Sequence, residues 1–459
     1  MKSIIALRTI LLAAGLFMSS LSFAQPDWTN MAPVHVPPKR ISPAMAQFGT
    51  GDAVVMFSGL NLGPAGVFSQ HNVLGDTWVW DGSDWTPITS FFLTPALPSA
   101  RFGASMAYDP INKRTVLFGG VDANGQILSD TWLFGTQKLC LKFSSCTTLY
   151  QWSPLTFAAG ASPPGRRNAS MGFDPSEGIV LTGGSTAAGT NFSDTWKFIG
   201  SSSTWVHVTT NAPSPARSQT PLAQCDAGSS TQNAMLFGGT AGSSIPLGDT
   251  WEFFFANEIG DIWGPLSPSS HPLARFGHGM AYYPVSLFDV LYGGNVGFVE
   301  GIGAVIAADT WNGKCTPSWA QATPAHNPGP RWLQGMTTGP SGMKVVLFGG
   351  SDLAFGSAFP NGRDRNDTWV WGRQVACLPV DGSQLSVGSE VICQFDAVFD
   401  PDAMFGGWSA IGFAPPFRTE LTQTFHTEHP GAATITASWT DATGAHDQTF
   451  NYIIVPRHH

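Results

Sequence analysis

Six arginines and six aspartates recur along the chain at matching positions, and their type and spacing could serve chemistry. A ring of guanidinium groups could hold an anionic or hydroxylated ligand. Alternatively, the two sets could pair with each other and fix loops. We favour this structural interpretation, because a ligand site needs asymmetry and these positions repeat. The residues are Arg40, Arg101, Arg166, Arg217, Arg275 and Arg331, with Asp76, Asp130, Asp194, Asp249, Asp309 and Asp367.

Motifs of zinc enzymes and serine hydrolases do not occur in the sequence, which has no His-x-x-x-His, Cys-x-x-Cys or Gly-x-Ser-x-Gly. The chain carries 22 Lys and Arg against 31 Asp and Glu, a formal net charge of −9. An acidic chain without clustered Lys or Arg is a poor partner for nucleic acid. We therefore expect no metal, no cofactor and no nucleic-acid partner.

The elements that position these residues are repeats of about 60 residues. Each repeat has an Arg, a strand, a turn, a second strand ending in Gly-Gly, a loop, and then Asp-Thr-Trp. The clearest copy runs RFGASMAYDPINKRTVLFGG from Arg101 to Gly120, with DTWLF from Asp130. The first repeat departs, with Ser58-Gly59 in place of the glycine pair. Short strands repeated at such a period indicate the blades of a propeller.

Six copies of this pattern over residues 25–375 closely resemble kelch repeats. The resemblance implies an all-β fold, a six-bladed kelch β-propeller. Each blade has four strands, lettered a to d in chain order, and strand d carries a further Trp. Five such tryptophans follow their own repeats: Trp85, Trp152, Trp205, Trp263 and Trp319. The sixth repeat lacks one, and Trp28 precedes the first. We therefore expect residues 25–32 to supply strand d of the last blade and close the ring.

The two ends of the chain differ from the repeats. Residues 1–24 have basic residues, a short apolar run and small residues at Ser22 and Ala24, the pattern of a cleaved signal peptide. Residues 376–459 include two alternating runs around an Asp-Ala-Thr-Gly-Ala turn. They resemble the last strands of a small immunoglobulin-like or PKD-like β-sandwich. We expect a secreted or periplasmic monomer, with no membrane insertion after signal cleavage.

Six cysteines in an exported chain are compatible with three disulfides. Cys140 with Cys146, and Cys377 with Cys393, are close in sequence, which leaves Cys225 and Cys315 for each other. The last pair would join turns on the same face of adjacent blades. The weakness of this pairing is the radial distance between the two cysteines. The a–b turns lie nearer the propeller axis than the c–d turns do, which argues for a gap too wide for a disulfide. The next choice for Cys315 is Cys377.

Asymmetry between the repeats lies in their b–c loops. Residues 60–75, 295–308 and 351–366 form the three longest, and they belong to neighbouring blades. Long loops often carry function, so we predict one ligand-binding sector on this face. The alternative is that these loops contact the C-terminal domain or cover the propeller. The predicted ligand-binding residues are Phe298, Phe355, Phe359, Arg363, Arg365, His71, Arg275, His278, Arg331 and Trp332.

Two enzyme classes stay open as alternatives. Galactose-oxidase-like copper-radical oxidases also place a kelch propeller beside an immunoglobulin-like domain. However, Tyr108 and Tyr282 occupy a repeated position and are interpreted as framework, so no copper ligand carries over. Sugar mutarotases are the second class, with Glu258 and Glu300 as candidate acids. We predict an exported, non-enzymatic binding or scaffold protein that recognises a glycan or a protein through one propeller face.

Overall fold

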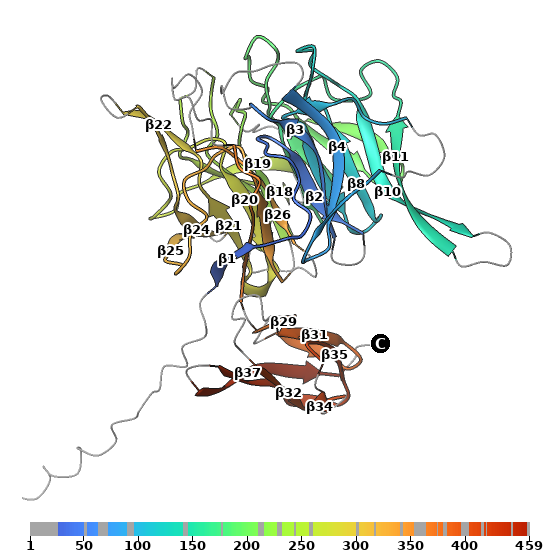
Figure 1. The fold of residues 1–459 in the computed structure, drawn as a ribbon, viewed down its shortest axis with the longest axis vertical. Coiled ribbons are helices and arrows are strands. Elements are labelled where there is room, and N and C mark those ends of the chain that lie inside the picture. The colour runs from blue at the N-terminus through green and yellow to red at the C-terminus, as the bar shows by residue number, and fades with distance from the viewer. Residues whose placement is uncertain are drawn as a thin grey trace, which may run out of the picture.

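The computed structural model describes twenty stretches of the chain, which are coloured in Figure 1. They are residues 26–49, 53–62, 72–89, 96–140, 146–175, 178–209, 215–226, 232–242, 245–256, 260–299, 303–315, 318–339, 343–352, 364–373, 375–379, 383–395, 404–414, 417–418, 420–441 and 444–456. The predicted signal peptide lies outside them. Among the described residues, no helix is long and apolar enough to cross a membrane.

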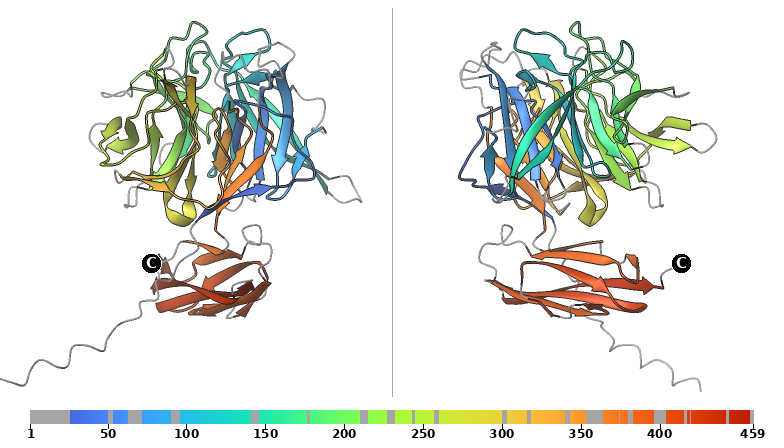
Figure 2. Two further views of the ribbon diagram at one scale, coloured as in Figure 1. Left: turned by 60° about the vertical axis from the view of Figure 1, so that its left-hand side comes forward. Right: turned by 90° about the vertical axis from the view of Figure 1, so that its right-hand side faces the viewer.

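Strands dominate the described residues, and the first part of the chain forms six four-stranded antiparallel sheets around an axis (Figures 1 and 2). Sheet 1 contains β2 (Ala44–Phe48), β3 (Ala53–Leu60), β4 (Val73–Trp80) and β5 (Trp85–Pro87); sheet 2 contains β7 (Ser105–Asp109), β8 (Arg114–Phe118), β10 (Thr131–Cys140) and β11 (Cys146–Leu155); sheet 3 contains β12 (Ser170–Asp174), β13 (Gly178–Thr182), β14 (Thr195–Ile199) and β15 (Thr204–Val208).

The other three sheets have the same four-stranded arrangement. Short strands and one 3-10 turn occur in the connections between the main strands. Sheet 4 contains β16 (Leu222–Asp226), β17 (Gln232–Phe237), β18 (Thr250–Ala256) and β19 (Gly260–Leu266); sheet 5 contains β20 (Gly279–Tyr283), β21 (Phe288–Tyr292), β24 (Thr310–Lys314) and β25 (Ser318–Ala322); sheet 6 contains β26 (Gly335–Thr338), β27 (Val345–Phe348), β28 (Thr368–Gly372) and β1 (Asp27–Met31). The connecting pieces are β6 (Arg101–Phe102) with β9 (Val121–Asp122), β22 (Asn295–Val299) with β23 (Gly303–Ile306), and the 3-10 turn η2 (Pro284–Ser286).

Sheet 6 joins the two ends of the repeat region. Its outer strand is β1, which pairs antiparallel with β28 so that Trp28 lies opposite Trp371. The sequence predicts this role for residues 25–32 from the position of Trp28. A strand taken from the N-terminus covers what would otherwise be an unpaired edge of β28.

A tryptophan on the outer strand of each sheet bonds to the preceding sheet. In sheet 1, Trp85 Nε1 donates to Thr368 Oγ1 of sheet 6 at 2.8 Å, and in sheet 6, Trp28 Nε1 donates to Thr310 Oγ1 of sheet 5 at 2.9 Å. The remaining bonds are Trp152 to Thr77, Trp205 to Thr131, Trp263 to Thr195 and Trp319 to Thr250. The threonine is always the one in Asp-Thr-Trp, so the two motifs of the repeat meet across every boundary between sheets.

The C-terminal part forms two further sheets below the ring (Figure 2). One contains β29 (Val375–Leu378), β31 (Glu390–Phe395), β35 (Thr422–Thr427) and β33 (Phe413–Ala414); the other contains β30 (Gln384–Ser386), β37 (Gly444–Val455), β36 (Gly431–Asp441), β32 (Met404–Ile411) and β34 (Phe417–Arg418). They share a core of their own around Trp408, Phe425 and Ile435. Ala376 and Leu378 of β29 also pack with Tyr283 and Met343 of the ring.

Two of the three predicted cysteine pairs form disulfides among the described side chains. The Cα atoms of Cys225 and Cys315 are 5.7 Å apart in a disulfide that links sheet 4 to the end of β24 in sheet 5. Cys377 and Cys393 form a second disulfide between β29 and β31. The backbone register places Cys140 opposite Cys146 in the β10–β11 hairpin. The radial objection fails for Cys225 and Cys315, because both lie in the apolar boundary between the two sheets.

Replacing both Cys225 and Cys315 by serine is expected to lower the free energy of unfolding by about 2–4 kcal/mol, because the bond closes a loop of 90 residues. Urea unfolding without reductant measures the change. The matched control is the Cys377→Ser, Cys393→Ser variant, whose shorter loop of 16 residues predicts a smaller loss. Equal loss in the two variants would contradict the loop-length argument.

Candidate functional site

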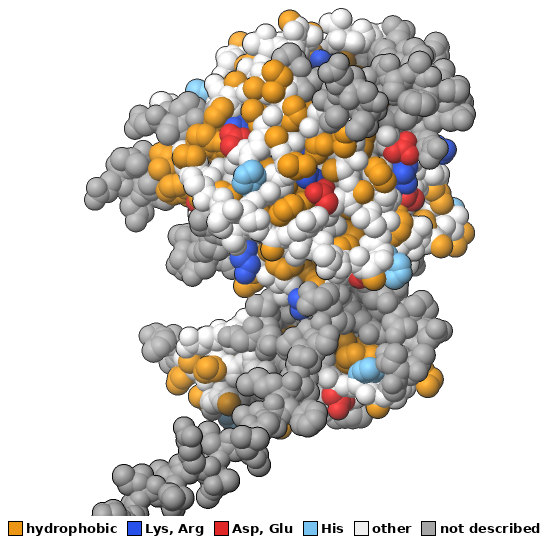
Figure 3. Space-filling model, turned by 90° about the vertical axis from the view of Figure 1, so that its left-hand side faces the viewer, with side chains coloured by type: hydrophobic (Ala, Val, Ile, Leu, Met, Phe, Trp, Pro, Cys, Tyr) orange, Lys and Arg blue, Asp and Glu red, His pale blue; other side chains and the backbone are white. Residues whose placement is uncertain are grey.

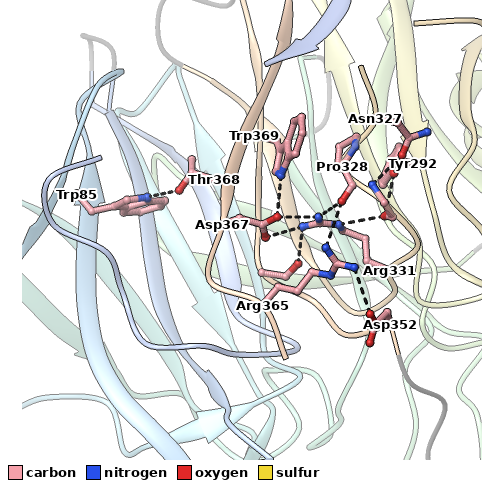
Figure 4. A network of polar contacts seen from close by, with 12 residues as sticks. Trp85, Tyr292, Asn327, Pro328, Arg331, Asp352, Arg365, Asp367, Thr368 and Trp369 are labelled. Carbon is pink, nitrogen blue, oxygen red and sulfur yellow. Dashed lines mark hydrogen bonds and ion pairs between the residues drawn. The ribbon is translucent and has the colours of Figure 1, made fainter. Parts of the chain in front are cut away.

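Each repeated arginine is buried and forms a bidentate ion pair with the aspartate of its own repeat. In sheet 6, Arg331 Nη1 and Nη2 donate to the two carboxylate oxygens of Asp367 at 2.8 and 2.9 Å (Figure 4). Arg331 Nη1 also donates to the carbonyl of Gly349, and Trp369 Nε1 donates to Asp367 at 2.7 Å. The other five pairs are Arg40 with Asp76, Arg101 with Asp130, Arg166 with Asp194, Arg217 with Asp249 and Arg275 with Asp309. The framework interpretation of these charges is confirmed.

These ion pairs also set the protonation of the aspartates. Burial alone would raise the pKa of each carboxyl group, but hydrogen bonds and charge from the paired arginine outweigh it and leave the pKa lowered. The carboxylates are therefore ionised at neutral pH. They neutralise the six guanidinium groups within the ring.

A second repeated feature is a closed ring of backbone hydrogen bonds around the axis. The second residue after each framework arginine donates its N–H to the carbonyl of its counterpart in a neighbouring sheet. The six bonds are Ser42 to Leu333, Gly103 to Ser42, Asn168 to Gly103, Gln219 to Asn168, Gly277 to Gln219 and Leu333 to Gly277, at 2.7–3.2 Å. All six residues have φ between 47° and 64°. The six bonds encircle the axis at the end where the arginines lie.

Sequence reasoning could not find this backbone ring. Its six residues are of five different types, because only their peptide groups take part. The side chain matters at one point. A Cβ on Gly103 would lie 2.5 Å from Asn168 Oδ1, so glycine is required there by space as well as by its positive φ.

Three of the predicted ligand-binding residues belong to this framework. Arg275 and Arg331 are fully buried in their ion pairs. Trp332 is 3 % exposed and packs edge-on against Phe276. Each of these side chains is buried in contacts of the framework, so a ligand on this face would contact the loops and not these three side chains.

His278 lies deeper, beside the channel. Its ring is buried, packs edge-on against Phe237, and finds no hydrogen-bond partner among the described residues. Burial, with a further contribution from the charge of Arg275, lowers the pKa of His278 to about 3, so the ring is neutral at physiological pH. It lines a small axial cavity of about 180 Å³ below the backbone ring.

The other predicted ligand residues fall in the long loops. Arg365 is half-buried, and its Nη2 contacts a carboxylate oxygen of Asp352 at 3.2 Å (Figure 4). His71, Phe355, Phe359 and Arg363 lie outside the described residues, and only the backbone of Phe298 is described, in β22. The predicted loop sector therefore stays a prediction.

A larger axial cavity of about 1150 Å³ lies at the opposite end of the channel, between the ring and the C-terminal sheets. We call it the axial chamber. The fifth and seventh residues after each framework arginine line it. The fifth residues are Met45, Met106, Met171, Leu222, Met280 and Met336, and the seventh are Gln47, Tyr108, Phe173, Gln224, Tyr282 and Thr338. Leu378, Pro379, Ser383, Ile392, Thr422 and Thr424 contribute from the C-terminal part.

Tyr108 and Tyr282 take on a different significance here. Their repeated spacing led to a framework interpretation, and both are indeed largely buried. Yet both line the axial chamber. The signal that could have marked this position is its variety, since the fifth residue is Met or Leu in every repeat whereas the seventh is aromatic, amide or hydroxyl.

One group of potential metal ligands occurs among the described residues. Ligand atoms of Cys225, Glu252 and Cys315 lie within 4.8 Å of one another. The two sulfur atoms are joined in a disulfide. They are not thiolates in this structure, so the group does not offer a metal centre.

Asp289 is a buried carboxyl group at a position that is uncharged in every other repeat. Its counterparts are Val54, Thr115, Ile179, Ala234 and Val345, and all six residues are fully buried. Neither carboxyl oxygen has a partner among the described residues, and burial raises the pKa of Asp289 well above its ordinary value. The group is therefore a local cost to stability without a visible partner.

Replacing Asp289 by valine is expected to stabilise the protein by about 1–3 kcal/mol, because an unpartnered buried polar group is removed. Between the ordinary pKa of an aspartate and the raised pKa of Asp289, the folded state keeps a proton that the unfolded state has released. The free energy of unfolding of the wild type therefore falls as pH rises through this range. The advantage of Asp289→Val should therefore grow from pH 5 to pH 9 in urea unfolding. A constant difference would show that Asp289 has a partner. Ile179→Val, at the same position in sheet 3, is the matched control.

Comparisons with known proteins agree with this geometry. The family described as "KLHDC2/KLHL20/DRC7 Kelch-repeats domain" matches residues 17–239. An F-box/kelch-repeat protein of Arabidopsis thaliana is 24 % identical over 290 residues, which cover 61 % of this chain and 56 % of that protein. These matches support a kelch β-propeller. The solved structure of the protein YjhT shares the fold, with a TM-score of 0.51 and 16 % identity over 75 % of this chain and 96 % of that one.

The kelch matches bear on the fold and leave the activity open. The aligned stretch spans little more than half of the Arabidopsis protein, and the likeness to YjhT is at the level of fold. Function therefore has to be argued from the sites of this chain.

Proposed function

We propose that this chain is an exported, non-enzymatic binding protein, built from a six-bladed kelch propeller and an immunoglobulin-like sandwich, that recognises a glycan or a protein. The observation that carries the proposal is the axial chamber of about 1150 Å³, which is slightly larger than an ordinary small-molecule site. The repeated charges are neutralised within the framework. What varies between repeats gathers at the chamber and in the long loops.

Export rests on the pattern of residues 1–24, and the two described disulfides are compatible with it. Expression of the full gene in a bacterial host with a Sec pathway tests this part. Cleavage after Ala24 predicts an exported chain that begins at Gln25, which intact mass spectrometry measures. A chain retained in the cytosol with Met1 in place would contradict export.

Recognition has two candidate surfaces. One is the axial chamber, and the other is the loop sector of residues 60–75, 295–308 and 351–366, which includes Phe298, Phe355, Phe359, Arg363, Arg365 and His71. Charged side chains are scattered over the face in Figure 3, and no single sign gathers there. Such a surface favours ligands recognised by shape and hydrogen bonds over strongly charged ones.

A glycan array with the purified mature chain, followed by calorimetry on each hit, tests the proposal. We expect saturable binding to a restricted set of glycans. If the array gives no hit, crosslinking on the surface of the producing cell tests for a protein ligand. Failure of both would overturn the proposed function, and so would turnover of a sugar or alcohol by the purified protein.

A further inference from the structure

The axial chamber has walls of mixed character and a roof of uniform character. The fifth-position residues form an apolar roof of five methionines and one leucine. Below them the seventh-position residues differ in chemistry around the axis, with aromatic rings in sheets 2, 3 and 5, amides in sheets 1 and 4, and a hydroxyl in sheet 6. Strands rise about 3.3 Å per residue, so the second layer lies roughly 7 Å below the first. An apolar roof above mixed walls suits a ligand with both apolar and polar faces.

Two structures close the chamber along the axis. The hydrogen-bonded backbone ring encircles the axis above the methionines, with the small cavity of about 180 Å³ between them. The first C-terminal sheet lies across the other end, where Leu378 of β29, Ile392 of β31 and Thr424 of β35 line the chamber. Figure 2 shows this sheet directly beneath the ring. The C-terminal part is therefore a wall of the chamber, and a ligand would enter between it and the ring.

Charge is the third property of the chamber. None of the described residues that line it is Asp, Glu, Lys, Arg or His. Burying an ion without a counter-charge is costly, so an ionic ligand would be rejected. Hydrogen-bonding groups are nevertheless present on Gln47, Ser383 and Thr422, and an amide can both donate and accept.

We propose that the axial chamber binds a short uncharged oligosaccharide, held between the aromatic and amide side chains of the ring and the first C-terminal sheet. The proposal rests on the proposed function and names its ligand class and site. Sugar rings have apolar C–H faces that pack on Tyr and Phe, and hydroxyl groups that suit Gln, Ser and Thr. A purely apolar ligand would offer no hydrogen-bond partner to the amide of Gln47, and an anionic sugar would find no cation among the described lining residues.

The test measures binding of the full mature chain by calorimetry to three uncharged probes, namely maltotriose, cellotriose and chitotriose. A trisaccharide of galacturonic acid serves as the anionic counterpart. We expect at least one uncharged probe to bind, and the anionic one to bind at least about tenfold more weakly, which corresponds to about 1.4 kcal/mol. Preference for the anionic probe would overturn the proposal.

Variants locate the site. Tyr108→Ala and Tyr282→Ala should each weaken binding about tenfold, whereas Tyr108→Phe, which keeps the ring, should weaken it less. Val206→Ala, on the exposed outer strand of sheet 3, is the control. Thr424→Trp fills the chamber from the C-terminal side and changes no residue of the ring, so it should abolish binding while thermal unfolding of the propeller is unchanged. Unchanged affinity in Thr424→Trp would overturn the role of the C-terminal sheet.

The outcome also separates this inference from the proposed function. Binding that survives Tyr108→Ala, Tyr282→Ala and Thr424→Trp but is lost in Phe355→Ala would assign recognition to the loop sector. The proposed function would then stand and the axial site would fall. If no probe binds and the array finds no other glycan, the axial site falls as well, and only a protein ligand would keep the proposed function.

Discussion

Replacing Trp28 by alanine is expected to lower the free energy of unfolding by about 3–5 kcal/mol, the usual cost of removing a large aromatic side chain from a core. Trp28 is fully buried in β1. Its ring packs against Tyr292 and Trp371, with centroids 5.1 and 5.3 Å away. Its Nε1 donates to Thr310 of sheet 5, so one side chain ties β1 to two sheets.

The physical reason for so large an effect is closure of the ring. Among the described residues, β28 pairs with β27 on one side and with β1 on the other, so β1 joins the N-terminal end of the repeat region to sheet 6. Urea unfolding followed by tryptophan fluorescence measures the loss, and Asn30→Ala, at an exposed position of the same strand, is the control. A loss below about 1 kcal/mol, the level of many surface substitutions, would mean that β1 does not hold the ring closed.

The role of Trp28 shows why much of the fold could be predicted from the sequence. Each repeated side chain does the same job in each sheet, so its type is fixed. Arginine reaches a carbonyl and a carboxylate at once, and the first glycine of each pair has a positive φ that places it against the next sheet. Six copies make such positions visible without an alignment.

The candidate site was harder to predict, for three physical reasons. The backbone ring leaves no trace in residue type, because peptide groups alone form it. Tyr108 and Tyr282 recur at one position of the repeat, and such recurrence favours a framework role over a ligand-binding one. The third reason is the C-terminal sheet, whose contribution through Ile392 and Thr424 depends on how the two parts dock. The repeat pattern does not predict how the C-terminal part packs against the ring.

The buried charges of the framework carry the second large effect. Asp194→Ala is expected to lower the free energy of unfolding by about 3–5 kcal/mol, because it leaves the guanidinium of Arg166 buried without a counter-charge. Arg166 is fully buried, and its Nη1 and Nη2 lie 2.6 and 2.7 Å from the two carboxylate oxygens. Trp196 Nε1 would also lose its acceptor.

The pH dependence separates a lost ion pair from lost packing. Hydrogen bonds and charge from Arg166 outweigh the effect of burial and hold the pKa of Asp194 below its ordinary value. The unfolded state therefore binds a proton first, and the stability from the pair is present above the ordinary pKa of about 3.9 and lost as pH falls through the folded value. The difference in the free energy of unfolding between Asp194→Ala and the wild type should be full at pH 7 and shrink below about pH 4.

Two further variants serve as controls. The stability of Asp194→Asn should lie between that of Asp194→Ala and that of the wild type, since the amide oxygen still accepts from Arg166. Asp447→Ala, at an exposed acid in β37, should change nothing at either pH. A loss that is the same at pH 3 and pH 7 would show that packing, and not charge, is what Asp194 contributes.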